Sequence, residues 1–251
     1  MTLLAVLFVV LALWHLWALP RPADDRPAAR HGTFVADALE VFAAFFRLPG
    51  IVRVLTFLLL YRFAEAQLLK LVMPFILDPL AAGGLGLKTQ NVGIAYGTVG
   101  VTALTVGGLL GGWVISRVGL KRALWPLIFS MHVPNVVFVA LALWQPQALA
   151  LLSVAVGVEQ FGYGFGFTAY MVYMLMVASG PDGHNPHKTA HYALCTGFMA
   201  LGMMLPGMWS GWLQSQLGYL NFFIWVCIAT LPSFAAAAWI RIDPEFGRRS
   251  E

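Results

Sequence analysis

The sequence predicts an all-α, polytopic membrane helix bundle with about seven transmembrane helices. Of the 251 residues, 60% are hydrophobic and only 10% are charged, whereas a soluble domain carries about 25% charged residues. Runs of about 20 apolar residues, the length that crosses a bilayer, follow one another along the chain. The net charge of +4 matters through its distribution about a membrane, so we expect the lipid bilayer as a partner and no nucleic acid.

The apolar runs divide the chain into an N-terminal helix, a linker, a domain and a tail. The first run has neither a basic start nor a small-residue cleavage site before Pro20, which favours a retained N-terminal transmembrane helix over 1–20. A polar, cytoplasmic linker over 21–50 contains spaced apolar residues that predict an interfacial amphipathic helix. A six-helix domain over 51–240 and a cytoplasmic tail over 241–251 follow. The six helices are expected at 52–77, 92–115, 123–144, 149–178, 190–213 and 220–240.

The basic residues predict the orientation of the chain. With the linker in the cytoplasm, all of the 15 lysines and arginines except Arg62, Lys70 and Lys88 fall in cytoplasmic segments, as the excess of positive charge on that side requires. Arg62 and Lys70 lie within a span, and Lys88 falls in an outer loop. We therefore expect a multi-pass protein of the inner (plasma) membrane, with the N-terminus outside and the C-terminus in the cytoplasm.

The helix over 52–77 carries Arg62, Glu65 and Lys70 inside an apolar run. A charge at the bilayer centre costs about 2.5–3.5 kcal/mol even on insertion scales, so such groups face a protein interior or a water-filled cavity. Arg62 and Glu65 are three residues apart and share a helix face, where they can pair. Two interpretations stay open: a structural ion pair that fixes helix packing, or a solute or proton site in a transporter.

The turn after the span over 92–115 contains a short basic signature, with its residues Gly112, Arg117, Gly119, Lys121 and Arg122. It resembles the cytoplasmic signature G-x-x-x-D-R-x-G-R-[RK] of the major facilitator superfamily. Ser116 stands at the acidic position of that signature and Leu120 at its next basic one. The resemblance implies a gating loop between two spans.

A weak internal repeat also favours the resemblance to the major facilitator superfamily. Gly111-Gly112-Trp113 precedes Gly119, and Ser210-Gly211-Trp212 precedes Gly218 at the same spacing. The first helix of each three-helix group carries an acid, Glu65 or Glu159. An inverted 3+3 repeat is the internal symmetry of a facilitator half; chance recurrence among glycine-rich helices is the alternative.

Two further stretches narrow the resemblance. Leu58-Leu59-Leu60-Tyr61-Arg62-Phe63-Ala64-Glu65 and the segment over 158–170 are similar to the seventh and tenth helices of the AmpG-type muropeptide permeases. The similarity covers about 50–240 and corresponds to the C-terminal half of such a transporter. It implies that a second six-helix half, from a homodimer or a companion chain, completes the pathway.

The resemblance also implies the residues of the pathway, because the first helix of each group lines the central cavity in that family. Glu65 and Glu159 are the proton-coupling candidates, since burial in an apolar helix disfavours the charged form of a carboxyl group. A hydrogen bond to a neighbouring helix is the alternative role for Glu159. The expected solute-binding residues are Arg62, Gln67, Lys70, Gln160, Tyr163 and Tyr170.

Other polar residues in the helices predict structural roles. His132 and Asn135 flank Pro134, and we expect their side chains to satisfy carbonyls that the proline frees. His184, His187 and His191 have a spacing that could bind a metal, but a solvated loop is favoured. Because the sequence has no zinc signature, phosphate-binding loop or nucleophile elbow, we expect no metal, no cofactor and no enzymatic activity.

The sequence therefore predicts a secondary active transporter, proton-coupled and specific for a small polar organic solute such as a muropeptide or a sugar-peptide. A non-transporting membrane scaffold or regulator derived from a half-transporter is the main alternative. An intramembrane enzyme is disfavoured because no catalytic set is present.

Overall fold

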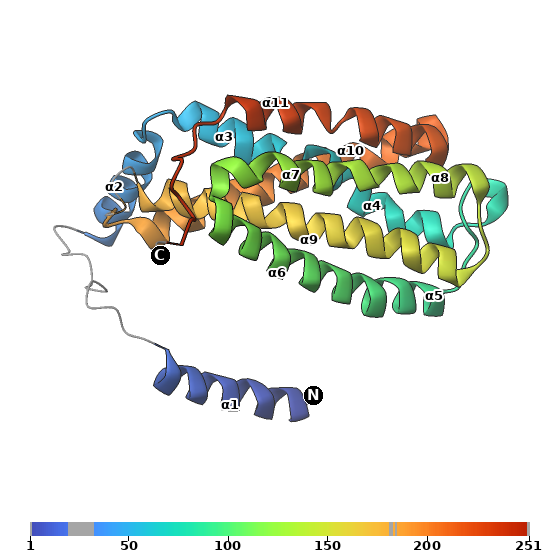
Figure 1. Ribbon diagram of the computed structural model, residues 1–251, viewed down its shortest axis with the longest axis horizontal. Helices are drawn as coiled ribbons and strands as arrows, with labels where there is room; N and C mark the ends of the chain where they lie inside the picture. The colour runs from blue at the N-terminus through green and yellow to red at the C-terminus, as the bar shows by residue number, and fades with distance from the viewer. Residues whose placement is uncertain (1, 20–32, 181–182, 184, 250–251) are drawn as a thin grey trace. The chain divides into compact units, whose positions relative to one another are not determined.

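The structure is a computed structural model that describes residues 2–19, 33–180, 183 and 185–249. It consists of helices joined by short segments, and the described residues form no β-strand (Figure 1). The chain divides into two compact units, residues 1–38 and 39–251. The prediction of an all-α membrane helix bundle is confirmed.

The first unit contains α1 (Thr2–Ala18), an apolar helix of 17 residues whose side chains are all exposed. The predicted role of α1 as a bilayer span stays a prediction. Most of the predicted linker, residues 20–32, lies outside the described residues. The helix expected within that linker is present as α2 (Phe34–Phe46), which continues into the second unit.

The second unit contains the bundle, in which long apolar segments alternate with short turns. Its helices, in chain order, are α3 (Ile51–Leu60), α4 (Phe63–Leu77), η1 (Leu80–Ala82), α5 (Thr89–Ile94), the π-helix η2 (Ala95–Gly100), α6 (Val101–Val118), α7 (Leu120–His132), η3 (Val133–Asn135), α8 (Val136–Trp144), α9 (Leu149–Ser179), α10 (Lys188–Ile228) and α11 (Leu231–Trp239).

By length and composition, four described segments can cross a membrane, or five if the bent pair Val35–Phe46 and Ile51–Leu77 counts as one span. The longest of them, Lys188–Trp239, covers two predicted helices, because the backbone at Gly218 is not helical (φ 73°, ψ 168°). Gly202 lies against Leu59, whereas Ser233 donates a hydrogen bond to the carbonyl of Leu60. The two parts of this segment therefore both pass beside α3, and the chain reverses its direction between them at Gly218. This agrees with the prediction of separate helices over 190–213 and 220–240.

The turns gather at two ends of the bundle. At one end, Gln145 and Gln147 donate hydrogen bonds to the carbonyls of Gly84 and Leu85. At the other end, Leu120 donates its backbone N–H to Phe246, so the turn between α6 and α7 meets the C-terminal segment. This second end carries most of the exposed basic side chains, among them Arg117, Lys121, Arg122, Arg241 and Arg248.

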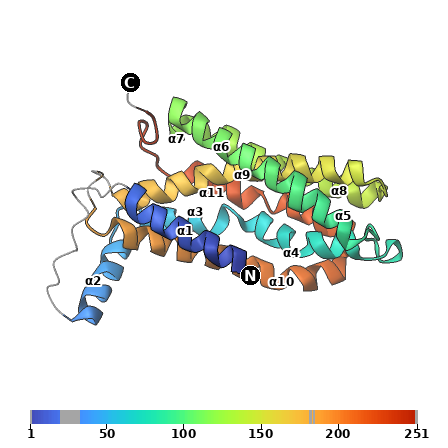
Figure 2. The ribbon, with the colours of Figure 1, turned by 90° about the horizontal axis from the view of Figure 1, so that it is seen from below.

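Helix α9 is packed between α6 and α7 and also contacts α10. The contact with α7 is close because α9 presents glycines there: a Cβ on Gly162 would collide with the carbonyl of Ser130, and one on Gly166 with the side chain of Met131. Glycine permits such backbone approach between membrane helices. These contacts fix the position of α9 beside α6 and α7 (Figure 2).

Candidate functional site

The first pass of the bundle is broken where the predicted site begins. Helix α3 ends at Leu60 and α4 begins at Phe63, with Arg62 at φ −106° and ψ 17°. Non-helical backbone at membrane depth is tolerated only where protein or a polar cavity satisfies it. Here two other helices supply donors: Tyr170 to the carbonyl of Leu58 at 2.6 Å, and Ser233 to that of Leu60 at 2.9 Å. The bundle therefore stabilises the break through hydrogen bonds from two other helices.

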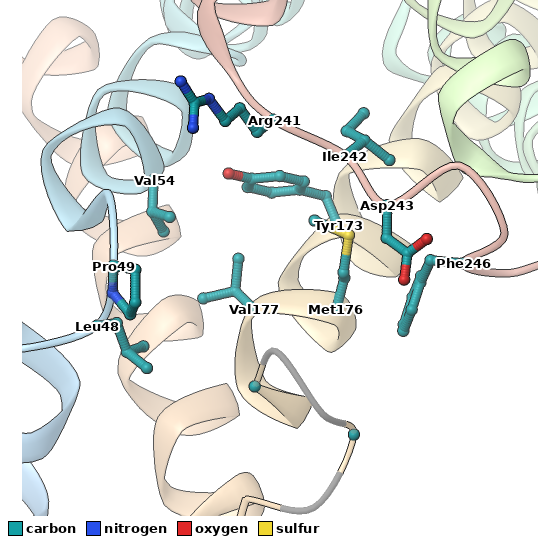
Figure 3. A pocket seen from close by; sticks show the side chains of 12 residues that line it. Leu48, Pro49, Val54, Tyr173, Met176, Val177, Arg241, Ile242, Asp243 and Phe246 are labelled. Carbon is teal, nitrogen blue, oxygen red and sulfur yellow. The ribbon is translucent and has the colours of Figure 1, made fainter.

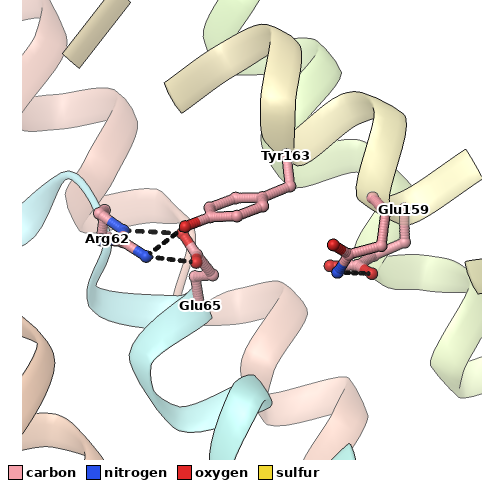
Figure 4. A network of polar contacts seen from close by, with 5 residues as sticks. Arg62, Glu65, Glu159 and Tyr163 are labelled. Atoms are coloured by element: carbon pink, nitrogen blue, oxygen red, sulfur yellow. Dashed lines mark hydrogen bonds and ion pairs between the residues drawn. The ribbon is translucent and has the colours of Figure 1, made fainter. Parts of the chain in front are cut away.

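Arg62 stands at this break and forms a buried network (Figure 4). Its Nη2 lies 2.7 Å from Glu65 Oε1 and its Nε lies 3.1 Å from Glu65 Oε2, which is a two-point ion pair. Nη2 also donates to the hydroxyl of Tyr163 at 2.7 Å. The guanidinium carbon lies 4.7 Å from the ring centre of Phe167, within cation–π range. Arg62 and Glu65 are only 7% and 3% exposed, so the pair is held almost dry.

Glu159 lies on α9 one turn before Tyr163 and is 3% exposed. The side-chain amide of Gln160 donates to Glu159 Oε2 at 2.9 Å. Among the described residues no basic side chain pairs with Glu159. Figure 4 shows Tyr163 between the Arg62–Glu65 pair and Glu159. The site thus combines Glu65, whose charge is balanced by Arg62, with Glu159, which has no basic partner among the described residues.

The remaining predicted solute-binding residues lie outside this network. Gln67 accepts a hydrogen bond from the indole N–H of Trp225 at 2.9 Å and donates to the carbonyl of Phe63. The hydroxyl of Tyr170 donates its hydrogen bond to the carbonyl of Leu58. Lys70 is exposed, with its side chain beside Gly207 of α10. The structure therefore brings together Arg62, Glu65, Tyr163, Glu159 and Gln160, and leaves Gln67, Lys70 and Tyr170 in other surroundings.

The turn with the basic signature is sealed by the C-terminal segment. Gly119 adopts φ 81° and ψ 157°, and a Cβ there would lie 3.1 Å from the carbonyl of Pro244. The N–H of Leu120 donates to Phe246 and that of Arg249 to Ser116, both at 2.9 Å. Residues 241–249, expected as a simple tail, are therefore docked on the bundle.

The other signature residues lie around the same turn. Lys121 and Arg122 are exposed, and Arg117, also exposed, has its guanidinium 5.5 Å from the ring centre of Trp113. A Cβ on Gly112 would meet only Thr168, at 4.0 Å, whereas one on Gly111 would lie 2.7 Å from the carbonyl of Phe165. The glycine of this segment that packs closely against α9 is thus Gly111, the neighbour of the signature residue Gly112.

The nitrogen atoms of His132 and Asn135 do not bond to the carbonyls that Pro134 frees, so this prediction is wrong for them. Both ring nitrogens of His132 and the amide nitrogen of Asn135 are buried without a hydrogen-bond partner. The hydroxyl of Tyr96, in the π-helix η2, is a further buried polar group without a partner. Sequence reasoning missed Tyr96, although π-helical turns are frequent at functional sites.

The histidine-rich loop gives no metal site among the described residues. His191 shares a 2.8 Å contact with the amide of Asn185, and the His187 and His191 rings are 6.0 Å apart. His184 lies outside the described residues. Trp225, which binds Gln67, was not singled out from the sequence, although an indole N–H in an apolar helix needs an acceptor.

These features define a multi-pass α-helical membrane protein with a buried ionic network in a broken helix, an arrangement that marks solute or ion pathways in membranes. No family model matches the chain. Among curated proteins it is similar to an anhydromuropeptide permease of Escherichia coli, with 25% identity over 231 residues, 91% of this chain and 44% of that protein. A putative AmpG transporter of Rickettsia felis is 23% identical over 80% of this chain and 42% of its own length.

An uncharacterized protein of Haemophilus influenzae is 27% identical over 78% of this chain and 46% of its own length. The chain thus spans less than half the length of these relatives. The named relatives are transporters and permeases rather than enzymes. The similarity relates this chain to membrane transporters.

Proposed function

We propose that this chain is one six-helix half of a proton-coupled secondary transporter of the major facilitator type, with a muropeptide-like solute. The observation that carries the proposal is the Arg62–Glu65–Tyr163 network beside the cation-free Glu159. The permease and transporter names of the relatives support the solute class. The inverted 3+3 repeat stays part of this proposal.

In this mechanism Glu159 carries the proton. A buried carboxyl without a cation is favoured in its neutral form, so Glu159 takes up a proton where its side of the carrier opens to water. Gln160 holds the carboxyl group in place by its hydrogen bond in either state. Release of the proton on the opposite side leaves a charge that is unfavourable in the closed bundle, so the loaded carrier closes readily only while Glu159 is protonated, which couples its movement to the proton.

Arg62 binds an anionic group of the solute. Its guanidinium already holds the carboxylate of Glu65 and the hydroxyl of Tyr163, and a solute carboxylate offers the same two-point geometry. Protonation of Glu65 frees Arg62 for that exchange. Phe167 and Tyr163 flank the guanidinium and offer ring faces to a sugar or peptide.

A second half completes the pathway. We propose a homodimer or a companion six-helix chain, in the inner membrane, with the basic end of the bundle and the C-terminus in the cytoplasm and the N-terminus outside. Mass measurement of the complex extracted gently from its own membrane tests this first. Two copies, or one copy with a second chain, support a complete carrier; a lone monomer favours the scaffold interpretation.

Uptake into proteoliposomes tests the activity. The complex that the mass measurement defines is reconstituted, a proton gradient is imposed, and entry of an anhydromuropeptide is followed. We expect Glu159→Gln to abolish gradient-driven uptake and leave folding intact, and the exposed Glu245→Gln to retain it. Uptake that ignores the gradient contradicts proton coupling. A complex that takes up no solute, and tolerates Glu159→Gln together with Arg62→Ala, is a scaffold.

A further inference from the structure

An exposed lysine lies within the membrane-spanning part of the bundle, outside the Arg62 network. Lys70 of α4 is exposed, and it forms no ion pair with another described residue. A Cβ on Gly207 of α10 would lie 3.1 Å from Cε of Lys70 and 3.3 Å from its Cγ. The stem of the lysine therefore lies across α10 at this glycine, and its charge is presented at the surface that α4 and α10 form together.

The depth of Lys70 makes an unpaired charge costly. Gly207, beside the lysine stem, lies about three turns before the reversal at Gly218, roughly 16 Å along α10. Because the hydrocarbon core of a bilayer is about 30 Å thick, the stem lies near its middle when the bundle spans the membrane. Helix side chains lean toward the helix N-terminus, so Lys70 leans away from the near end of α4 at Leu77. A charge that faces lipid at this depth is strongly disfavoured.

The surface around Lys70 is apolar. Four neighbouring side chains on the two helices are between 37% and 67% exposed: Leu69 and Met73 of α4, and Met204 and Met208 of α10. The two methionines lie on the same side of α10 as Gly207, because residues three and four apart share a helix face. We call these four residues and Lys70 the Lys70 face. Its leucine and methionine side chains offer no hydrogen bonds that would hold water around the ammonium.

The Lys70 face belongs to two helices that pack closely on each other, α4 and α10. It is separate from the cavity at the basic end of the bundle, which lies between the α2–α3 corner, the end of α9 and the C-terminal segment (Figure 3). None of the five residues of the face lines that cavity. An apolar face on two packed helices is suited to the docking of further membrane helices.

The described part of this chain supplies no free carboxylate for Lys70. In helices α3 to α11 the acidic side chains are Glu65 and Glu159, which are both only 3% exposed. Glu65 is already paired with Arg62, and α1 contains no acidic residue. In a two-fold pair the same patch of both copies meets itself. A second copy docked on this face would therefore bring a second lysine rather than an acid.

We propose that the Lys70 face docks a companion six-helix half that presents an aspartate or glutamate at the depth of Lys70. The carrier is then a pair of two different halves rather than a homodimer, an inference that rests on the proposed function. The carboxylate and the ammonium neutralise each other away from lipid, while the apolar side chains of the face pack against the companion. Loss of one partner would leave the other charge buried and uncompensated, so assembly depends on the pair.

Co-purification from the native membrane tests the charge. The tagged chain is extracted gently with its partner, and mass spectrometry gives the ratio of companion to chain. We expect Lys70→Met to lower this ratio at least about tenfold, and Lys70→Arg to retain it because the positive charge is kept. Lys88→Met is the matched control, since Lys88 is an exposed lysine directly before α5 and outside the Lys70 face.

Cross-linking of the unaltered complex identifies the carboxylate. A membrane-soluble carbodiimide activates a carboxyl group, and the amine of an adjacent lysine displaces the urea to form an amide. We expect an amide between Lys70 and an aspartate or glutamate of a different chain, located by mass spectrometry of the peptides. The Lys70→Arg complex is expected to assemble without this amide, because the guanidinium stays protonated.

The other outcomes separate this interface from the carrier function. A complex of two identical copies, or a companion ratio that Lys70→Met leaves unchanged, overturns the interface and leaves the carrier function standing. Loss of the companion in Lys70→Met without any amide in the unaltered complex contradicts the charge pair. A Lys70→Met complex that keeps its companion but has a raised KM for the solute returns Lys70 to solute binding. A chain without any partner removes both proposals, whereas an intact, amide-linked pair that takes up no solute removes only the carrier function.

Discussion

The hydroxyl of Tyr170 on α9 donates a 2.6 Å hydrogen bond to the carbonyl oxygen of Leu58, in the turn just before the break between α3 and α4. Both residues are buried, and the Tyr170 ring stacks on that of Tyr61 with 5.1 Å between centres. Tyr61 in turn donates to the carbonyl of Gly166 on α9. The two helices that carry the candidate site are therefore locked together directly beside it.

This relationship predicts the effect of Tyr170→Phe. The substitution removes the donor and leaves a buried carbonyl without its partner, so we expect a loss of about 1–3 kcal/mol of stability. Thermal unfolding of the purified protein in detergent measures it. Tyr192→Phe is the control, since the Tyr192 hydroxyl makes no hydrogen bond to another described residue. An unchanged melting curve with lost solute binding contradicts the structural role and restores the solute-binding one.

The Arg62–Glu65 pair predicts strongly non-additive substitutions. Arg62→Met or Glu65→Met alone leaves an unpaired buried partner, and breaking a buried pair in this way costs about 3–5 kcal/mol. The double variant Arg62→Met/Glu65→Met removes both charges and is expected to recover most of that loss. A double-mutant cycle in denaturant measures the coupling. Simple addition of the two single losses shows that the two side chains do not interact.

The close contact between α9 and α7 predicts that adding a single methyl group at Gly162 forces the two helices apart. Gly162→Ala places a Cβ against the carbonyl of Ser130, so the backbones must move apart, at a cost of about 1–3 kcal/mol from overpacking. Gly211→Ala is the matched control on α10, where no atom lies within 4 Å of an added Cβ. There alanine is expected to stabilise the helix by up to about 1 kcal/mol. Equal melting temperatures for the two variants contradict the close packing.

The unpartnered ring of His132 predicts a tolerant position. His132→Leu removes two buried nitrogens that make no hydrogen bond, and exchanging an unbonded polar group for an apolar one of similar size is nearly neutral. We expect a change of less than about 1 kcal/mol in unfolding free energy. A loss of several kcal/mol would instead reveal bonds to ordered water at the η3 turn.

Much of the bundle was predictable because bilayer-crossing helices are long and apolar and are separated by turns. The separate helices over 190–213 and 220–240 illustrate this: the polar and glycine residues near Gly218 indicate a reversal, and the structure has one there. The Arg62–Glu65 pair followed from its three-residue spacing. Both features are local in sequence.

The surroundings of Gln67 and of the C-terminal segment were not predictable. Gln67 lies two residues after Glu65, about half a helical turn, so its side chain leaves α4 on another face. Only the packed bundle shows that this face meets Trp225. Residues 241–249 are short and polar, which is typical of a free tail, yet their backbone bonds to the turn at Gly119. Both outcomes depend on which elements pack together.

The sequence by itself determined that this protein is a helical membrane bundle with charged groups inside it, because apolar run length and the cost of a buried charge are properties of single segments. Only the tertiary structure decided which polar groups meet. Tyr163 reaches Arg62 from 101 positions away, Tyr170 and Ser233 donate hydrogen bonds to the broken helix, and the C-terminal segment lines a cavity together with the end of α9. Those partners are set by helix rotation and depth, which arise from packing between segments rather than within one.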